Sequence, residues 1–381
     1  MPEPLIPFNR PLFLEEGITN VRKAYQNRIV SGDGEFTKRC EICFQQQLGA
    51  ARVLLTTSCT DALEMCALLL EIKAGDEVIM PAFTFVSTAN AFVLRGARPV
   101  FVDIRPDTLN LDETKIEAAI TSRTRAIVVV HYAGVGCEMR TITAIAARHG
   151  LPVIEDNAHG LFGAYRGKPL GSFCELATLS FHETKNLSCG EGGALVINDA
   201  KFIERAEIIR EKGTDRSRFF RGEVDKYTWR DVGSSFLPSD ILAALLFAQI
   251  GIADAIQAKR REIFERYATS LLPWAAGNGV KLPTIPEECT CSYHLFYLLL
   301  PDARAQLALI EHLRVNQINA VFHYQPLHLT PMGRQFGGKA GQCPVTESVA
   351  GRVVRLPFFF DLCTADQIRV ISAVTAFEVQ Y

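Results

Sequence analysis

The chain has 381 residues, of which 48% are hydrophobic, and its formal net charge is −2. A chain of this length buries a large core, and the near-neutral charge argues against nucleic-acid binding, because nucleic-acid-binding proteins usually carry a clear basic excess. No run approaches the roughly 18 apolar residues of a membrane span, so we expect no membrane partner.

Short β-branched runs and helical stretches alternate between about residues 50 and 200. Such alternation indicates βαβ units, which build a mostly parallel sheet with right-handed crossovers. The predicted strands cover residues 53–55, 77–80, 100–102 and 126–130, and the helices that follow them cover 60–70, 87–95, 113–120 and 140–149.

The pattern changes after residue 200. Dense charge and weak apolar periodicity over residues 205–231 predict an exposed loop region, and a long helix is expected over 240–267. A short strand is expected at 294–300 in a less regular C-terminal part. We therefore expect a large domain over residues 1–245, and a smaller α/β domain over 246–381 on which the N-terminal segment is a candidate to pack.

Cysteine usage and the N-terminus bear on the compartment. Eleven cysteines are scattered through the chain, and this odd number is typical of reduced thiols in the cytosol. The one metal-like spacing, Cys40-x-x-Cys43, lacks a second pair nearby, so we expect no metal site. The N-terminus has no basic segment followed by an apolar stretch, and a cytoplasmic protein is predicted.

Lys185 is the most informative position. It follows the strand-like run 177–181 and precedes three close-set glycines, which places a primary amine on an irregular turn. Asp156 ends another apolar run. A lysine and an aspartate at the ends of two buried strands are the pair needed to hold pyridoxal 5′-phosphate, because the lysine forms an imine with its aldehyde and the aspartate keeps its ring nitrogen protonated. The alternative to a cofactor site is that Lys185 is an ordinary loop lysine and that Asp156 only caps a turn.

A candidate phosphate site lies where the first predicted strand meets its helix. The stretch Thr56–Leu63 supplies hydroxyls and free backbone N–H groups at a helix N-terminus, where the helix dipole favours an anion. The amides of Cys59 and Thr60 and the Thr60 hydroxyl would hold a phosphate. The spacing of Ser58 and Asp61 also fits a helix cap, and both roles can coexist at one helix end.

Two further side chains could contact such a cofactor. Phe85 follows a predicted strand and could stack on a planar ring, although an aromatic residue there is more often part of the core. His159 lies three residues beyond Asp156, and it could contact the ring's phenolate oxygen or only cap the turn. The glycines at 190, 192 and 193 do not make a dinucleotide fingerprint, which weakens an NAD alternative.

Four motifs in this order resemble the DegT/DnrJ/EryC1/StrS family of sugar aminotransferases, a branch of the fold-type I enzymes that use pyridoxal phosphate. They are Thr57–Leu63, Pro81–Phe85, the Glu155-Asp156-x-x-His159-Gly160 turn, and Ser180-Phe181-His182-x-Thr184-Lys185 with Gly190–Gly193. The resemblance implies a seven-stranded, mostly parallel sheet domain with a smaller C-terminal α/β domain.

The resemblance also implies roles for residues. Lys185 would form the Schiff base with catalytic support from Asp156 and His159, and Phe85 would lie on the ring face. The other expected cofactor-binding residues are Ser58, Cys59, Thr60, Ser180, His182 and Ser235. Substrate binding is expected at Gly32, His131, Tyr132, Lys212, Arg216, His323 and Tyr324. A homodimer is implied, with Ser235 reaching the neighbouring site, but Leu237 stands where many relatives carry an arginine, which puts that contact in doubt.

Further stretches narrow the resemblance to dTDP-4-amino-4,6-dideoxygalactose transaminases of bacterial surface-polysaccharide synthesis. They are residues 6–9, 210–216, 225–235 and 322–328. The resemblance implies amino transfer from L-glutamate to the 4-keto carbon of dTDP-4-dehydro-6-deoxy-D-glucose. Alternatives are another keto sugar (UDP-linked or an inosose), a dehydratase relative, in which a histidine replaces the lysine, and a non-catalytic binding protein with the same fold.

Overall fold

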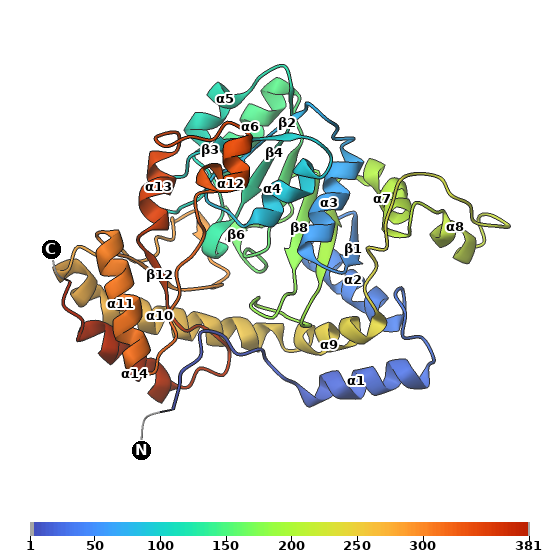
Figure 1. Ribbon diagram of the computed structural model, residues 1–381. Coiled ribbons are helices and arrows are strands. Elements are labelled where there is room, and N and C mark those ends of the chain that lie inside the picture. Colours follow the sequence, from blue (N-terminus) through green and yellow to red (C-terminus); the bar gives the residue numbers. More distant parts are fainter. Residues whose placement is uncertain (1–3, 380–381) are drawn as a thin grey trace.

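The computed structural model describes residues 4–379, and its centre is a seven-stranded sheet (Figure 1). Neighbouring strands from β5 to β3 and the pair β5–β8 run parallel, whereas β9 runs antiparallel to both of its neighbours. The predicted mostly parallel α/β sheet is confirmed. In spatial order the strands are β1 (Arg52–Thr56), β9 (Gly193–Ile197), β8 (Leu176–Ser180), β5 (Val153–Asp156), β4 (Thr124–Val130), β2 (Glu77–Pro81) and β3 (Arg98–Val102).

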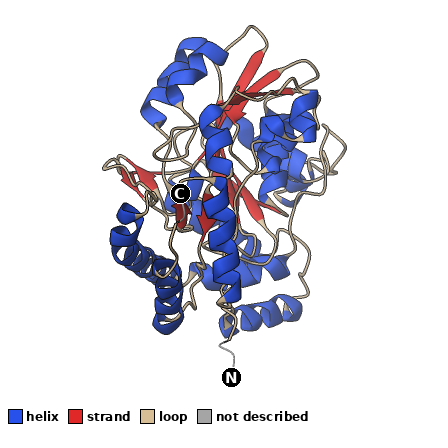
Figure 2. Cartoon of the chain, turned by 60° about the vertical axis from the view of Figure 1, so that its left-hand side comes forward, coloured by secondary structure: helices blue, strands red, loops and turns tan. Residues whose placement is uncertain are grey.

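Both faces of this sheet are covered by helices, as Figure 2 shows. Side chains alternate between the two faces of a strand. Leu54 therefore packs into one hydrophobic cluster while its neighbours Val53 and Leu55 pack into another. Val128 and Ile127 divide between the two faces of β4 in the same way. This double burial explains why the strands read as continuous apolar runs.

The four helices predicted between residues 60 and 149 are present, with bounds that differ by a few residues. Two unpredicted helices precede them, and the first of these packs against residues 240–250. In chain order the helices of this part are α1 (Glu15–Gln26), α2 (Glu35–Leu48), α3 (Cys59–Leu69), α4 (Val86–Val93), η1 (Glu113–Lys115), α5 (Ile116–Ala119), η2 (Tyr132–Gly134), α6 (Met139–His149) and η3 (Ala200–Phe202).

Two expectations after residue 200 were wrong in part. The predicted loop region contains α7 (Ile203–Arg210) and α8 (Arg216–Phe220). Ala206 and Ile209 of α7 are buried, and Arg210 is also buried, where it pairs with Glu41 and Asp33. The charged residues made this packed helix look like an exposed loop in the sequence. The single long helix is two, α9 (Asp240–Ile250) and α10 (Ala253–Gly277), bent by 65° after Gly251.

A second hydrophobic core lies in the C-terminal part. It joins residues between Ile263 and Val379, and Ile6 from the N-terminal segment packs into it. Strands β11 (Tyr297–Leu299) and β12 (Val353–Arg355) form a small antiparallel sheet, so the predicted strand is shorter than expected. The helices here are α11 (Ala303–Val315), η4 (Leu327–Leu329), α12 (Pro331–Gln335), α13 (Pro344–Ala350) and α14 (Thr364–Thr375). A third small sheet joins β10 (Cys289–Thr290), β6 (Ala164–Tyr165) and β7 (Lys168–Pro169).

Within residues 4–379 no single helix is both long and apolar enough to cross a membrane, although the bent pair α9 and α10 passes that test jointly. The same residues contain no group of three or more His, Cys, Asp or Glu side chains that could hold a metal ion.

Candidate active site

Lys185 lies in the loop that joins β8 to β9. Strand β8 ends at Ser180, and the Lys185 amide donates to the carbonyl of His182 at 2.9 Å, which folds the loop into a turn. Asp156 ends the neighbouring parallel strand β5 and pairs in register with Thr178 of β8. The two strands therefore bring Lys185 and Asp156 to the same edge of the sheet, where ligands of such sheets collect.

The charges of Lys185 and Asp156 act on each other. The pKa of the Lys185 amine is lowered to about 8, mainly by burial. Cys59 and Asp156 act to raise this pKa, and the positive charge of Arg355 acts to lower it. Burial raises the pKa of the Asp156 carboxyl, while the hydroxyl of Thr88, which donates to it at 2.7 Å, acts in the opposite direction. The site thus holds an amine that loses its proton near neutral pH, as a nucleophile or a general base requires.

The N-terminus of α3 faces the same region. The Ser58 side chain accepts from the Asp61 amide at 3.0 Å, which confirms the predicted helix cap. The amides of Cys59 and Thr60 precede the first hydrogen-bonded turn, so they are free to bind an anion. A Cβ atom on Gly193 would lie 2.4 Å from the Cys59 nitrogen, and only glycine permits β9 to pass so close to this helix end.

His159 is buried and lies in a stack of rings. Its ring centroid is 4.2 Å from that of His294, and its Nε2 lies 3.3 Å from the hydroxyl of Tyr324. The Nδ1 atom is buried and has no hydrogen-bond partner. Burial lowers the pKa of His159 well below the ordinary value, so the ring is neutral.

Three more predicted residues adjoin this stack. The Tyr132 hydroxyl pairs with Nδ1 of His323 at 2.7 Å, and the rings of His323 and Tyr324 stack at 3.7 Å. Phe85 precedes α4 and is 55% exposed, with its ring 6.2 Å from that of Tyr324. Burial lowers the pKa of His323 and raises that of Tyr132, so both side chains are uncharged.

These residues fit pyridoxal phosphate on three counts. The buried Nδ1 atom of His159 has no hydrogen-bond partner among the described residues, and a buried polar atom normally has one, so a ligand is suited to provide it. The free helix end beside Gly193 suits a phosphate, and the paired Lys185 and Asp156 suit the two ends of a substituted pyridine. The arrangement is suited to covalent attachment of an aldehyde and to proton transfer beside it.

His131 does not belong with this group. It is fully buried, its Nδ1 accepts from the Cys137 amide at 3.2 Å, and its Nε2 lies 3.1 Å from Glu155. Because Nδ1 accepts, Nε2 carries the hydrogen and donates it to the carboxylate. Both ring nitrogens are therefore used within the fold, and we withdraw His131 as a substrate-binding residue.

Four predicted residues lie on loops or short helices without a contact to Lys185 in this chain. The side chains of Lys212 and Arg216 form ion pairs with Glu211 at 3.4 and 3.9 Å. The backbone of Ser235 forms an isolated antiparallel β-bridge with that of Glu211. Gly32 lies against Leu237, since a Cβ atom there would be 2.2 Å from that side chain. In Figure 1 the segment around α8 extends away from the body of the chain.

His182 precedes Lys185 but faces the solvent side of the loop. Its Nδ1 lies 3.1 Å from the Thr184 hydroxyl and its Nε2 lies 3.7 Å from Glu191. Ser180, in contrast, is buried at the end of β8. Of these two expected cofactor-binding residues, Ser180 is therefore the better candidate within one chain, because it is buried at the strand end and His182 faces solvent.

Three residues of the site were missed from the sequence. Thr88 donates to Asp156, and His294 stacks on His159 with its Nδ1 3.0 Å from the Asn186 amide oxygen. Arg355 acts electrostatically on Lys185. Thr84 and Thr88 bond to each other at 2.8 Å, and their four-residue spacing beside Phe85 was a usable signal. His294 and Arg355 lie over 100 residues further along the chain, and no local pattern marks them.

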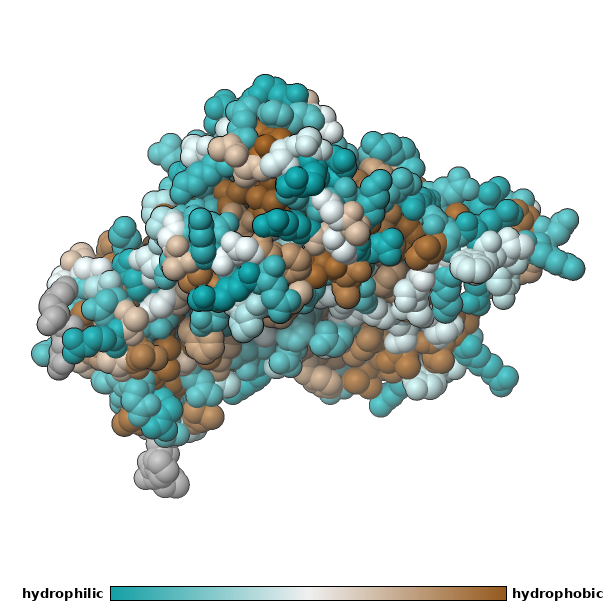
Figure 3. Space-filling model, turned by 45° about the horizontal axis from the view of Figure 1, so that its top comes forward, coloured by the Kyte–Doolittle hydropathy of each residue, from teal (hydrophilic) through white to brown (hydrophobic). Residues whose placement is uncertain are grey.

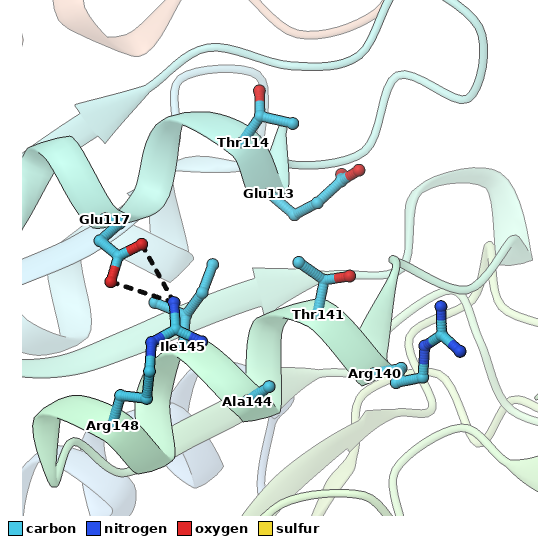
Figure 4. A pocket seen from close by; sticks show the side chains of 8 residues that line it. All are labelled: Glu113, Thr114, Glu117, Arg140, Thr141, Ala144, Ile145 and Arg148. Carbon is cyan, nitrogen blue, oxygen red and sulfur yellow. Dashed lines mark hydrogen bonds and ion pairs between the residues drawn. The ribbon is translucent and has the colours of Figure 1, made fainter.

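A separate hollow of about 380 Å³ lies between η1–α5 and α6, near the top of Figure 1. Figure 4 shows that its charged side chains include Glu117 and Arg148, which pair at 3.0 Å. None of the residues predicted for the active site lines it. This hollow is therefore separate from the predicted site at the β5 and β8 strand ends.

Comparison with known proteins agrees with this fold. The pattern of the DegT/DnrJ/EryC1/StrS aminotransferase family matches residues 13–375. The spore coat polysaccharide biosynthesis protein SpsC of Bacillus subtilis is 32% identical over 97% of this chain and 96% of its own length. The aminotransferase TlmJ of Streptoalloteichus hindustanus shares 30% identity over 98% of both chains, with a TM-score of 0.89.

A putative sugar aminotransferase of Streptococcus pneumoniae, Spr1654, has been solved in a PMP form. It is 25% identical, covers 97% of this chain and 98% of its own, and superposes with a TM-score of 0.90. With the family pattern spanning nearly the whole sequence, the chain belongs to the DegT/DnrJ/EryC1/StrS aminotransferase family.

Proposed function

We propose that this aminotransferase uses pyridoxal 5′-phosphate to move the amino group of L-glutamate to dTDP-4-dehydro-6-deoxy-D-glucose. The products are dTDP-4-amino-4,6-dideoxy-D-galactose and 2-oxoglutarate. The observation that carries the transamination is the proximity of Lys185 and Asp156, with an amine pKa of about 8, at neighbouring strand ends beside the free N-terminus of α3.

Each residue has a defined task in this proposal. The cofactor, when bound, supplies the electron sink for the carbon acid. Lys185 would attach the cofactor through its amine and would carry a proton to and from the substrate carbon. Asp156 would hold a proton on the ring nitrogen through a charge-assisted hydrogen bond. The free Nδ1 of His159 would donate to the ring's oxygen, and the amides of Cys59 and Thr60, with Ser58 and Ser180, would hold the phosphate.

The sugar substrate rests on the family and on the subgroup motifs. Two relatives are named for sugar or polysaccharide chemistry, SpsC and Spr1654. Of the stretches that resemble the dTDP-sugar subgroup, residues 322–328 support this substrate, since His323 and Tyr324 lie in the ring stack with His159. We assign these two residues and Tyr132 to the sugar pocket.

We further propose that two copies of the chain share their active sites. Arg216 begins α8 of the segment that projects in Figure 1, and Lys212 and Ser235 lie where the chain enters and leaves that segment, so we assign these three residues to a neighbour's site. Large apolar side chains on this segment and around α4 are exposed, and they include Phe85, Val86, Phe220, Tyr227 and Trp229. Figure 3 shows that hydrophobic areas interrupt the hydrophilic surface on the face drawn there.

The division into lobes at residues 1–245 and 246–381 and the cytoplasmic location form part of the same proposal. The separate C-terminal hydrophobic core supports the first of these. All eleven cysteines are free thiols, which supports the reducing compartment.

The test is an assay with purified enzyme, dTDP-4-dehydro-6-deoxy-D-glucose and L-glutamate, with the configuration of the amino sugar read by NMR. The expected product carries the new amine in the galacto configuration. Preferential turnover of a UDP-linked keto sugar or an inosose would transfer the proposal to that substrate. Absence of turnover with every keto sugar would favour a non-catalytic binding protein.

A further inference from the structure

Two buried threonines and the Asp156 carboxylate form one chain of hydrogen bonds. Thr84 lies in the turn after β2, and Thr88 lies in the first turn of α4. Their exposed fractions are 2% and 0%. The Thr88 hydroxyl donates to Oδ2 of Asp156 at 2.7 Å, and the two threonine hydroxyl oxygens lie 2.8 Å apart.

The direction of each hydrogen bond in this chain follows from the number of hydrogens. A hydroxyl has one hydrogen and two lone pairs. Because the hydrogen of Thr88 goes to Asp156, the hydrogen between the two threonines must come from Thr84. This order holds while Asp156 is ionised, since a carboxylate accepts hydrogen bonds and donates none.

The bond from Thr84 helps to fix the orientation of the Thr88 hydroxyl. A threonine on a helix can instead turn its hydroxyl to a carbonyl of the preceding turn. Thr143 of α6 does so, and it donates to the Met139 carbonyl at 2.7 Å. At Thr88 the hydroxyl accepts from Thr84 and donates to Asp156, and hydrogen bonds linked in this way strengthen one another.

Asp156 keeps room for another donor. Its Oδ1 atom accepts from the Ala158 amide at 3.3 Å, and each carboxylate oxygen can accept more than one hydrogen bond. Burial raises the pKa of Asp156, and the largest opposing influence is the hydrogen bond from Thr88. The threonine hydroxyls therefore favour the ionised carboxylate that a protonated ring nitrogen requires.

We propose that Thr84 and Thr88 are positioning residues, which hold the Asp156 carboxylate in the orientation that binds the ring nitrogen of the cofactor. The inference rests on the role proposed above for Asp156 and adds the residues that support it. Phe85, which we place on the ring face, lies between the two threonines in the chain. One turn between β2 and α4 would thus serve both the face and the nitrogen of the ring.

The test measures binding of pyridoxamine 5′-phosphate to the cofactor-free enzyme by calorimetry, because this form of the cofactor binds without joining Lys185. Thr88→Val keeps the shape of the side chain and removes its hydroxyl. We expect the Kd to rise by about 10- to 100-fold, as loss of a hydrogen bond to a charged group implies. Thr88→Ser keeps the hydroxyl and should restore most of the affinity.

A double-mutant cycle shows whether Thr88 acts through Asp156. In an Asp156→Asn background, Thr88→Val should raise the Kd by less than about threefold, because the amide has no charge for the hydroxyl to stabilise. Thr84→Val leaves the contact between Thr88 and Asp156 in place. It should raise the Kd by about 2- to 10-fold, the range for a hydrogen bond between neutral groups.

The matched control is Thr143→Val, since the Thr143 hydroxyl bonds within α6. This variant should leave the Kd unchanged. If Thr88→Val weakens binding equally in the wild-type and Asp156→Asn backgrounds, Thr88 only supports the local packing and the inference is rejected. An unchanged Kd in Thr88→Val would also reject it. Both results leave the proposed transamination intact, whereas a wild type that does not bind pyridoxamine 5′-phosphate would overturn that function first.

Discussion

Two buried histidines follow neighbouring strands of the same sheet, and their surroundings differ. His131 follows β4 and uses both ring nitrogens, one for the Cys137 amide and one for Glu155. His159 follows β5 and leaves Nδ1 without a partner. His131 therefore belongs to a hydrogen-bond network that the chain completes by itself. His159 belongs to a network that a ligand would complete.

The carboxylates beside these histidines differ in the same way. Glu155 accepts from the amides of Gly171, Phe173 and Cys174 at 2.7–3.0 Å, in addition to His131. Asp156, the next residue, points to the other side of the strand, where it has Thr88, the Ala158 amide and the nearby charge of Lys185. Adjacent acids on one strand thus serve stability on one face of the sheet and chemistry on the other.

The largest effect is expected at Lys185. Lys185→Ala removes the amine that attaches the cofactor and moves the proton, so kcat should fall by at least about 10²–10⁴-fold, the usual contribution of positioned proton transfer. Borohydride treatment followed by peptide mass mapping should label Lys185 in the wild type only. The control is Lys201→Ala, which removes an exposed lysine paired with Asp199. A label on another lysine would contradict the assignment.

Glu155→Gln should damage the completed network. The new amide group would direct N–H donors at the Gly171 amide or at the Nε2 hydrogen of His131, leaving buried donors unpaired. The free energy of unfolding should fall by about 1–3 kcal/mol, the cost of leaving a buried hydrogen-bond donor unsatisfied. Denaturant melts of the cofactor-free protein measure it. A fully stable variant would mean that this network does not support the fold.

Asp156→Asn should show the opposite behaviour. Loss of the charge-assisted hydrogen bond should lower kcat by about 10- to 100-fold. Burial raises the pKa of Asp156, so its contribution to stability is present at low pH and is lost as the pH rises through that raised pKa. At neutral pH the cofactor-free Asn variant should therefore be at least as stable as the wild type in the same melts. Parallel losses of stability at positions 155 and 156 would remove the distinction between them.

A smaller, graded effect is expected from pH. The Lys185 amine is unprotonated above its pKa of about 8. The rate at which cofactor-free enzyme takes up pyridoxal phosphate should therefore rise with pH, with a midpoint near 8 and a plateau above it. Below that midpoint each pH unit should slow uptake about tenfold. Absorbance after mixing measures this rate. A midpoint near 10.5, the ordinary value for lysine, would mean that burial does not act on this amine.

Local patterns predicted the parts of the site that lie beside strand ends. Lys185, Asp156 and the cap at Ser58 were found because each follows a readable strand in the chain. The helix α7 was missed because Arg210 made the segment look solvated, although the pairing with Glu41 buries it. The break at Gly251 was missed because the residues on either side are helical.

The sequence by itself determined the α/β alternation and placed Lys185 and Asp156 at strand ends, because periodicity and strand-end placement are local properties. Only the tertiary structure decided that the fold uses both ring nitrogens of His131 and leaves Nδ1 of His159 free, and brought His294 into the ring stack with His159. Those outcomes depend on which side chains meet across the sheet and between its helices. Hydrogen-bond partners and burial are set by such distant contacts, so no local pattern contains them.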